Sequence, residues 1–287
     1  MALKDLLVYV DQTEGALERL RLAVDLASRH SSRLAVLYVR EWSPPQQQER
    51  GTAELGLVSA HEFVRMERRI EASIEHAGQR LRSTLETLGR ERDLQTEWRC
   101  VDGRASTLVP QHARCADLCI VGTGASADRD SVESTFSQDM LFVTGRPVLF
   151  IPASRSVETL GRHVAVAWNS SLVAMRAMND ALPLIEHAER ATVLTANPAH
   201  SIDKQGYVPA QQLVGHLQRH NSSVSVVQLN DVPAGSIADA LQAQARALGA
   251  DLMVAGAFGQ AKLREKLLGG VTCDLLARMR LPIFMSH

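Results

Sequence analysis

The sequence has few aromatic residues and no excess of positive charge. Phe, Trp and Tyr make up 4% of the 287 residues, and 31 Lys and Arg are balanced by 32 Asp and Glu, for a net charge of −1. Proteins that hold nucleic acid use a basic field, and those that bind single strands stack the bases on aromatic rings. The composition therefore argues against a nucleic acid as partner.

Long hydrophobic runs are also missing. Although 45% of the residues are hydrophobic, no run approaches the roughly 20 residues that cross a bilayer. The first residues, Met1-Ala-Leu-Lys-Asp5, already include two charged side chains, so we expect no signal peptide. These features predict a cytoplasmic protein without a membrane partner. The length favours about two domains.

Cysteine is scarce, with four residues in the chain. Two of them, Cys115 and Cys119, flank or enter a predicted buried strand, and no second pair completes a zinc pattern. Two interpretations remain open. Cys100, Cys115, Cys119 and Cys273 are small buried hydrophobes in a reducing cytosol, or Cys115 and Cys119 have a redox role.

Short apolar strands alternate with amphipathic helices through the first half of the chain. We predict strands over 6–10, 34–39, 96–101, 117–122 and 147–151, and helices over 14–29, 58–88, 105–114 and from about 134. The third strand alternates only partly, which favours an edge. The long helix carries apolar residues from Phe63 to Leu88 at spacings of three, four and seven. This stripe fits packing on a sheet or a coiled-coil seam.

The same order of elements then restarts. We predict strands over 163–168, 191–196, 224–229, 250–256 and 281–285, and helices over 172–187, 237–248 and from 271. For example, Ala250-Asp-Leu-Met-Val-Ala-Gly256 matches Ala116-Asp-Leu-Cys-Ile-Val-Gly122. An internal repeat of half the chain predicts two domains, 1–152 and 162–287, with a linker from Pro152 to Arg162. We call them the first half and the second half.

Alternating strands and helices predict an α/β fold, with two tandem open parallel sheets and helices on both faces. Such sheets bind ligands past the carboxyl ends of their strands, where the strand order reverses. If the order is 3-2-1-4-5, this point lies between the first and fourth strands. In the second half these two strand ends carry Asn169 and Gly256.

A glycine motif follows the fourth strand of the second half. Gly256 and Gly259 come directly after the strand, and Gly269-Gly270 precede the helix that begins near Val271. Glycine lets a ligand approach the backbone closely, and the free N–H groups of a helix start attract anions. The layout is typical of a phosphate cradle, although the first two glycines alone also fit an ordinary loop. It matches neither the Walker nor the Rossmann pattern.

The full spacing, Gly256-x2-Gly259-x9-Gly269, resembles the nucleotide-binding signature of the universal stress protein family, G-x2-G-x9-G-[S/T]. Gly270 departs from it, because a hydroxyl is missing while the backbone N–H remains. The resemblance covers both halves and is to a tandem universal stress protein. It implies an adenine-nucleotide alpha-hydrolase-like fold, and as ligand ATP, ADP or AMP, with or without Mg²⁺.

The resemblance also implies roles for single residues. In the family an acid at the end of the first strand meets the adenine base. Asp11 matches it in the first half and Asn169 replaces it in the second, where an Asx turn or helix cap is the alternative role. Lys262 and Arg264 either reach phosphates or are merely solvated. The predicted site comprises Asn169, Ala196, Ala255, Gly256, Gly259, Gly269, Gly270, Val271 and Thr272, without a catalytic residue or metal ligand.

The first half departs further from the signature. Ala125 stands for the second glycine, and Ser134-Thr135 stand for the glycine pair. The loop between them carries Asp128, Asp130 and Glu133, which would repel a phosphate unless a cation intervened, or are simply solvated. We therefore expect one strong nucleotide site, in the second half. The resemblance also implies that the two fifth strands meet, which would make the chain an intramolecular pseudo-dimer; further homo-oligomers stay open.

Three functions compete. The first is a cytoplasmic stress-response protein that binds an adenine nucleotide and acts as a sensor or interaction module with an unknown protein partner. The second is a slow ATPase or phosphotransferase, for which the sequence offers no Walker-type metal ligands and no evident base. The third is an interaction module that binds no nucleotide.

Overall fold

The computed structural model describes residues 2–41, 60–123, 132–153, 157–197, 207–221, 223–258 and 270–287. The strands of the first half are β1 (Asp5–Val10), β2 (Arg33–Arg40), β3 (Thr96–Asp102), β4 (Leu118–Thr123) and β5 (Val148–Pro152). Those of the second half are β6 (His163–Ala167), β7 (Arg190–Ala196), β8 (Val224–Leu229), β9 (Leu252–Gly256) and β10 (Ile283–Ser286). Each lies at a predicted position, within one or two residues at most ends.

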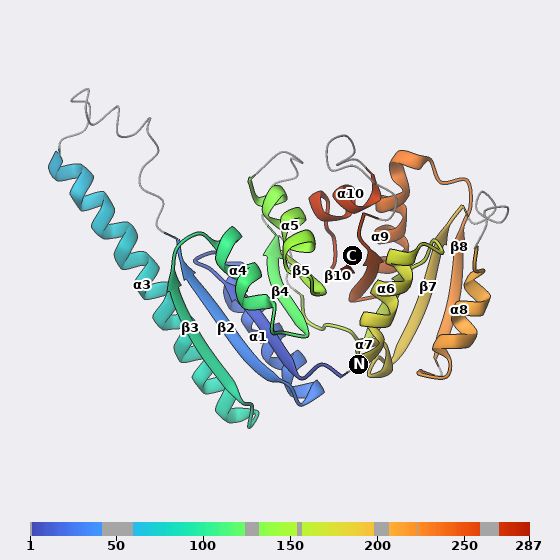
Figure 1. Cartoon of the computed structure of the whole chain (residues 1–287), viewed down its shortest axis with the longest axis horizontal. Coiled ribbons are helices and arrows are strands. Elements are labelled where there is room, and N and C mark those ends of the chain that lie inside the picture. Colours follow the sequence, from blue (N-terminus) through green and yellow to red (C-terminus); the bar gives the residue numbers. More distant parts are fainter. Residues whose placement is uncertain are drawn as a thin grey trace.

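These strands form one ten-stranded sheet in the order β3-β2-β1-β4-β5-β10-β9-β6-β7-β8 (Figure 1). Each half therefore has the predicted order 3-2-1-4-5, with parallel neighbours. The halves meet where β5 pairs with β10 in antiparallel register, with Ile283 opposite Phe150 and Met285 opposite Val148. The expected contact between the fifth strands is confirmed, and β3 is an edge strand as predicted.

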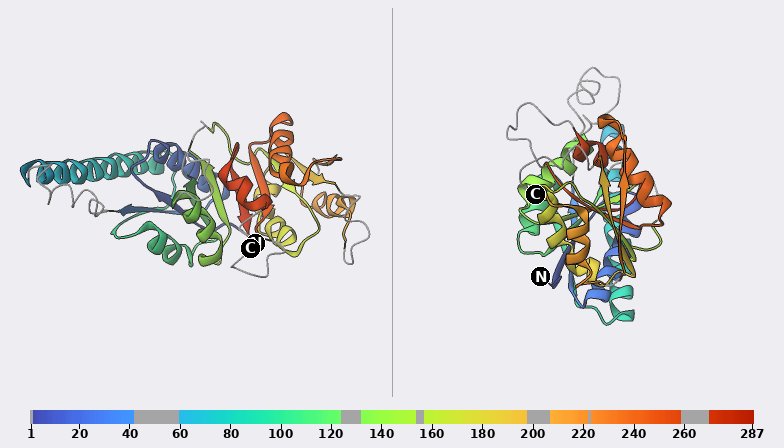
Figure 2. Two further views of the ribbon diagram at one scale, coloured as in Figure 1. Left: turned by 90° about the horizontal axis from the view of Figure 1, so that it is seen from above. Right: turned by 90° about the vertical axis from the view of Figure 1, so that its right-hand side faces the viewer.

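Helices cover both faces of the sheet (Figure 2). One face carries α1 (Gly15–His30), α3 (Ala60–Glu91), α6 (Leu172–Asp180), α7 (Leu182–Glu186) and α8 (Ala210–Leu217). The other carries α4 (Ala105–Ala113), α5 (Val132–Val143), α9 (Ile237–Ala247) and α10 (Val271–Ala277), with the short 3-10 helix η2 (Ala234–Ser236) before α9. The inner strands are nearly continuous apolar runs because they bury both of their faces, whereas the edge strands β3 and β8 are only partly buried.

The buried core continues across the junction between the halves. Phe150 of β5 and Phe284 of β10 are fully buried and belong to opposite faces of the sheet. Neither central strand exposes an edge, because each is paired on both sides. The two halves of the sheet therefore stabilise one another by apolar burial as well as by backbone hydrogen bonds.

Helix α3 only partly follows the prediction that its apolar stripe packs on the sheet. Ile74, Leu81 and Leu85 are buried, but Met66 and Ile70 are each 42% exposed. The reason is geometric: β3 is the edge, and the first turns of α3 extend past it (Figure 1). The apolar stripe is therefore largely buried from Ile74 onwards and exposed in the first turns of α3.

Two further features differ from the predictions. The helix predicted over 172–187 is divided at Ala181 into α6 and α7, because Pro183 lies in the first turn of the second helix and has no backbone N–H to donate to the first. Helix α8 lies between β7 and β8, where the pattern predicts no helix. It has only eight residues, and its buried stripe is limited to Ala210, Leu213 and Leu217.

The cysteines divide into two groups. Cys119 and Cys273 are buried as predicted, and burial raises the pKa of Cys119 to about 12. Cys100 and Cys115 are exposed, so the expectation of four buried thiols is wrong for these two. Cys100 lies on the edge strand β3, and Cys115 lies in the turn between α4 and β4. All four thiols are free, without a disulfide.

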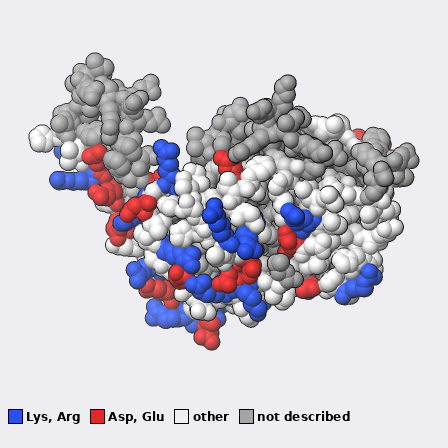
Figure 3. Space-filling view, in the orientation of Figure 1, with Lys and Arg blue, Asp and Glu red and all other residues white. Residues whose placement is uncertain are grey.

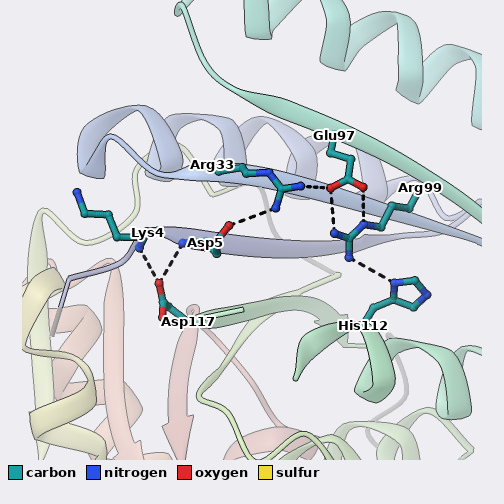
Figure 4. Close-up of polar contacts among 7 residues, drawn as sticks. All are labelled: Lys4, Asp5, Arg33, Glu97, Arg99, His112 and Asp117. Atoms are coloured by element: carbon teal, nitrogen blue, oxygen red, sulfur yellow. Dashed lines mark hydrogen bonds and ion pairs between the residues drawn. The ribbon is translucent and has the colours of Figure 1, made fainter. Parts of the chain in front are cut away.

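At the amino ends of the strands, the same side-chain contact occurs in both halves. Asp117 Oδ2 accepts hydrogen bonds from the backbone N–H groups of Lys4 (2.7 Å) and Asp5 (3.0 Å), as Figure 4 shows. In the second half, the Asp251 carboxylate accepts from Arg162 (3.1 Å) and His163 (3.0 Å). In both halves one aspartate at the start of the fourth strand therefore fixes the start of the first.

Ion pairs continue from this end across the first three strands. Arg33 lies between Asp5 and Glu97, and Arg99 donates two hydrogen bonds to the Glu97 carboxylate (Figure 4). The hydrogen bond from Arg99 lowers the pKa of Glu97. Basic and acidic side chains are likewise interspersed over the face of the molecule in Figure 3. These charges limit edge-to-edge pairing at β3 more than they stabilise the fold.

Candidate functional site

The strand order of the second half brings the ends of three strands together. Strand β6 lies between β9 and β7, and all three are parallel. Asn169 follows β6, Ala196 ends β7 and Gly256 ends β9, so these residues lie at one edge of the sheet. The edge includes the point where the strand order reverses, which is where open α/β sheets bind ligands. Gly259, Gly269, Lys262 and Arg264 lie outside the described residues.

Gly256 is required for packing, whatever ligand binds. A Cβ atom at this position would lie 2.5 Å from both Val173 C and Ala174 N, which are backbone atoms at the start of α6. Backbone atoms cannot move aside as the end of a side chain can. The absence of a side chain at Gly256 therefore lets α6 begin directly against the end of β9.

Asn169 forms an Asx turn, the role expected as the alternative to contact with the base. Its Oδ1 accepts the Ser171 backbone N–H (3.1 Å), which forms an Asx turn. Ser171 then caps α6, since its Oγ accepts the Ala174 N–H (3.2 Å). The Asn169 side chain is exposed, so its amide is accessible to a ligand as well as to the turn.

A second backbone segment lies over the end of β6, which the sequence did not predict. Trp168 is 6% exposed, and its Nε1–H donates to Val208 O (3.0 Å). The Val208 N–H in turn donates to Ser170 Oγ (2.6 Å). A tryptophan at a strand end, one of three in the chain, is the signal that could have pointed to this contact.

The residues after β9 are bound to the first turn of α10. Ala255 is buried in β9, and the Phe258 N–H donates to Thr272 Oγ1 (3.1 Å). Gly270 has φ +121°, and no atom lies within 4 Å of where its Cβ would be. Backbone conformation rather than crowding therefore favours glycine there. This gives a physical reason for the missing Ser or Thr, because a side chain would strain the turn before Val271.

The corresponding edge of the first half is filled by an arginine. Arg19 of α1 is 3% exposed, and its Nε–H donates to Tyr9 O (2.8 Å) at the end of β1. Its guanidinium lies against Gly122, where a Cβ atom would be 2.0 Å from Nη1. The arginine therefore occupies the space between the ends of β1 and β4.

The acid that would meet an adenine base in the first half is engaged by this arginine. Asp11 Oδ1 lies 3.1 Å from Arg19 Nη2, and it also accepts hydrogen bonds from the Thr13 N–H and hydroxyl. Counting from Asp11 and Asn169, the second-half equivalent of Arg19 is Ala177, which is fully buried. An arginine between Ala16 and Leu20 on an apolar helix face was the signal, because a buried charge needs a partner.

The predicted departures in the glycine loop of the first half are only partly visible. Ala125, Asp128 and Asp130 lie outside the described residues, and the backbone at Glu133, Ser134 and Thr135 belongs to α5. No group of three His, Cys, Asp or Glu among the described residues is placed to hold a metal ion. No helix in the described ranges combines the length and apolar character that a membrane crossing requires.

A cavity of about 190 Å³ lies elsewhere, at the junction of the two halves. Its lining includes Asp117 and Arg146 from the first half and Arg176, Asp180 and His287 from the second. Arg176 Nη1–H donates to His287 O (2.7 Å) across its wall. None of the described residues of the predicted nucleotide site lines this cavity, so those residues form a separate site.

Comparison with known proteins shows the fold. A universal stress protein from Archaeoglobus fulgidus DSM 4304 is 17% identical, with TM-score 0.66 over 98% of this chain and 95% of its own. A universal stress protein candidate from Pseudomonas aeruginosa UCBPP-PA14 is 14% identical, with TM-score 0.60 over 99% and 93%. No protein-family model matches the sequence, and no curated protein matches it. The chain therefore has the universal stress protein fold along nearly its whole length, which confirms the fold expected from the sequence.

Proposed function

We propose that this protein is a universal stress protein that binds one adenine nucleotide at the carboxyl edge of its second half. The observation that carries the proposal is the place of the two described glycines of the motif: Gly256 ends β9 and Gly270 directly precedes α10, beside the point where the strand order reverses. In this role it acts in the cytoplasm as a stress-response sensor or interaction module, and its protein partner is unknown.

Each part of the proposed site supplies a different contact. The Asn169 amide and the Ala196 backbone meet the base, and the backbone from Ala255 through the glycine motif meets the phosphates. The Thr272 hydroxyl accepts the Phe258 N–H, and its own hydrogen is left to donate to a phosphate oxygen. Gly259, Gly269 and Val271 complete the phosphate contacts, with or without Mg²⁺.

The first half supports a single site. A nucleotide placed there as in the second half would meet the Arg19 guanidinium over Gly122, and Asp11 already accepts from Arg19 and Thr13. Moving Arg19 would leave the Tyr9 carbonyl and the Asp11 carboxylate without this partner. We therefore infer that the first half contributes structure rather than a second equal site.

Calorimetry with ATP, ADP and AMP tests the binding proposal. We expect heat of binding for at least one nucleotide, and Gly259→Val weakens it because its side chain would lie where the phosphates approach, at a cost of at least ~1–3 kcal/mol. Gly215→Val in α8 is a matched control, because no atom lies within 4 Å of a Cβ there. No heat and no thermal shift at millimolar nucleotide would contradict the proposal.

Hydrolysis tests the rival enzymatic function. We expect ATP turnover below about 1 s⁻¹, the low end of ordinary enzymes, since the sequence offers neither an evident base nor a Walker-type metal set. Faster turnover that disappears in Gly259→Val would establish an ATPase. Turnover that persists in that variant points to a contaminant.

A further inference from the structure

Phe258 has a backbone conformation that phenylalanine rarely adopts. Its φ is +54°, in the left-handed region, where bulky side chains are uncommon. The residue lies two positions after Gly256, and its N–H donates to Thr272 Oγ1 in the first turn of α10 (3.1 Å). Phe258 therefore links the two described parts of the candidate site. A costly conformation at such a place persists only if its surroundings hold it.

The ring that stacks on Phe258 belongs to the first half of the chain, and the His287 ring of the second half stands edge-on to Phe258 at 6.3 Å. Phe142 of α5 stacks on Phe258 with ring centroids 4.5 Å apart and planes at 25°. The His287 ring stands edge-on to Phe142, at 5.2 Å and 70°, and His287 Nδ1 lies 3.0 Å from Ala257 O. Helices α5 and α10 also pack together where the halves meet (Figure 1).

We propose that Phe142 is a positioning residue through which the first half shapes the nucleotide site of the second; this inference rests on the proposed function. The Phe142 ring keeps Phe258 in its left-handed conformation, and the Phe258 N–H keeps Thr272 and the start of α10 at a fixed distance from Gly256. The first half thus acts on the site without contacting the nucleotide. Removing the stack frees Phe258 to leave this conformation, and the site is then no longer preorganised.

The neighbouring residue provides a matched control. Phe142 and Val143 are adjacent in α5 and almost equally exposed, at 46% and 45%. Phe142 makes the ring contacts with the second half, and Val143→Ala removes neighbouring apolar atoms of α5 while leaving those contacts in place. If Phe142 only covered the junction between the halves, its loss would change stability and leave nucleotide affinity unaltered.

The experiment measures ATP affinity by calorimetry in the full chain. We expect Phe142→Ala and Phe142→Leu to weaken binding roughly 2- to 10-fold, the range that an aromatic pair contributes to an equilibrium constant. Phe142→Tyr keeps the ring and retains the wild-type affinity, as does Val143→Ala. In a Phe258→Gly background, where glycine adopts the conformation freely, Phe142→Ala has no further effect. Wild-type affinity in Phe142→Leu would overturn the proposal.

A second measurement separates this inference from the proposed function. Hydrogen exchange of the Phe258 amide, without nucleotide, reports its bond to Thr272 directly. We expect faster exchange in Phe142→Leu than in the wild type or Val143→Ala. If the wild type binds no nucleotide, faster exchange supports the positioning and only the proposed function fails. Unchanged exchange in Phe142→Leu overturns the positioning even if the wild type binds ATP.

Discussion

Asp117 in the first half and Asp251 in the second each accept two backbone N–H groups, from equivalent positions at the start of the first strand. The equivalent glycines Gly122 and Gly256, by contrast, are covered by different groups. At Gly122 the cover is the Arg19 guanidinium, and at Gly256 it is the backbone that begins α6. The amino edge of each sheet is thus built alike, while the carboxyl edges have diverged. Open α/β sheets bind ligands at the carboxyl edge, so a difference there bears on ligand binding more than on the fold.

The largest expected effect comes from adding one methyl group at each glycine. Gly256→Ala should lower the free energy of unfolding by about 2–3 kcal/mol, because the methyl meets backbone atoms of Val173 and Ala174. Gly122→Ala should cost less, about 1 kcal/mol, because the end of the Arg19 side chain can shift. Urea unfolding of both variants measures the difference. An equal or reversed order would show that the two glycines are not covered as described.

Gly215→Ala is the control for this pair. Gly215 lies in α8, and no atom is within 4 Å of a Cβ there. Alanine should raise stability by about 0.5–1 kcal/mol, since it loses less backbone entropy than glycine in a helix. A loss at all three positions would point to a general effect of glycine replacement instead of local packing.

The next effect concerns the arginine that distinguishes the first half. Arg19→Met keeps the apolar stem and removes the charged group, which leaves Tyr9 O and Asp11 without this donor. We expect the free energy of unfolding to fall by about 1–3 kcal/mol. In an Asp11→Asn background the cost of Arg19→Met should be smaller, and a double-mutant cycle measures this coupling. Full additivity would mean that the ion pair contributes nothing.

The smallest effect is a pH dependence at the contact between the halves. The rings of His30 in α1 and His187, just after α7, lie 4.4 Å apart. Burial, and then the charges of His187 and Arg29, lower the pKa of His30 from 6.5 to about 4. The unfolded chain therefore binds the proton more readily, and the contribution of His30 is present above its unfolded pKa and is lost as pH falls towards 4.

We expect this contribution to change stability by roughly 1 kcal/mol between about pH 7 and 5. The His30→Gln variant should show a shallower fall in unfolding free energy over this range. Some slope will remain, because burial and Arg190 also lower the pKa of His163. Equal slopes in the variant and the wild type would exclude His30 as a source.

The architecture could be predicted because it follows from local patterns. Apolar runs marked the strands, and the similarity of 116–122 and 250–256 indicated the repeat and hence the shared strand order. The glycine spacing marked the carboxyl edge of the second half. These features depend on residues close together in sequence, where period and turn chemistry are informative.

The contacts that distinguish the two halves could not be predicted in this way. Arg19 covers Gly122, and Phe142 stacks on Phe258, across more than a hundred residues in each case. Whether Gly256 is needed for a ligand or for the start of α6 also depends on a helix far away in sequence. Such pairings arise from the tertiary arrangement of neighbouring elements, on which a single sequence is silent.

The stoichiometry of ATP binding tests the central claim most directly, because it counts the functional carboxyl edges. Calorimetric titration of the full chain should saturate near one nucleotide, and Gly259→Val should abolish that binding. Ala125→Val, the corresponding change in the first half, should leave both the affinity and the stoichiometry unchanged. Two equal sites per chain, or binding that survives Gly259→Val and is lost in Ala125→Val, would contradict the account.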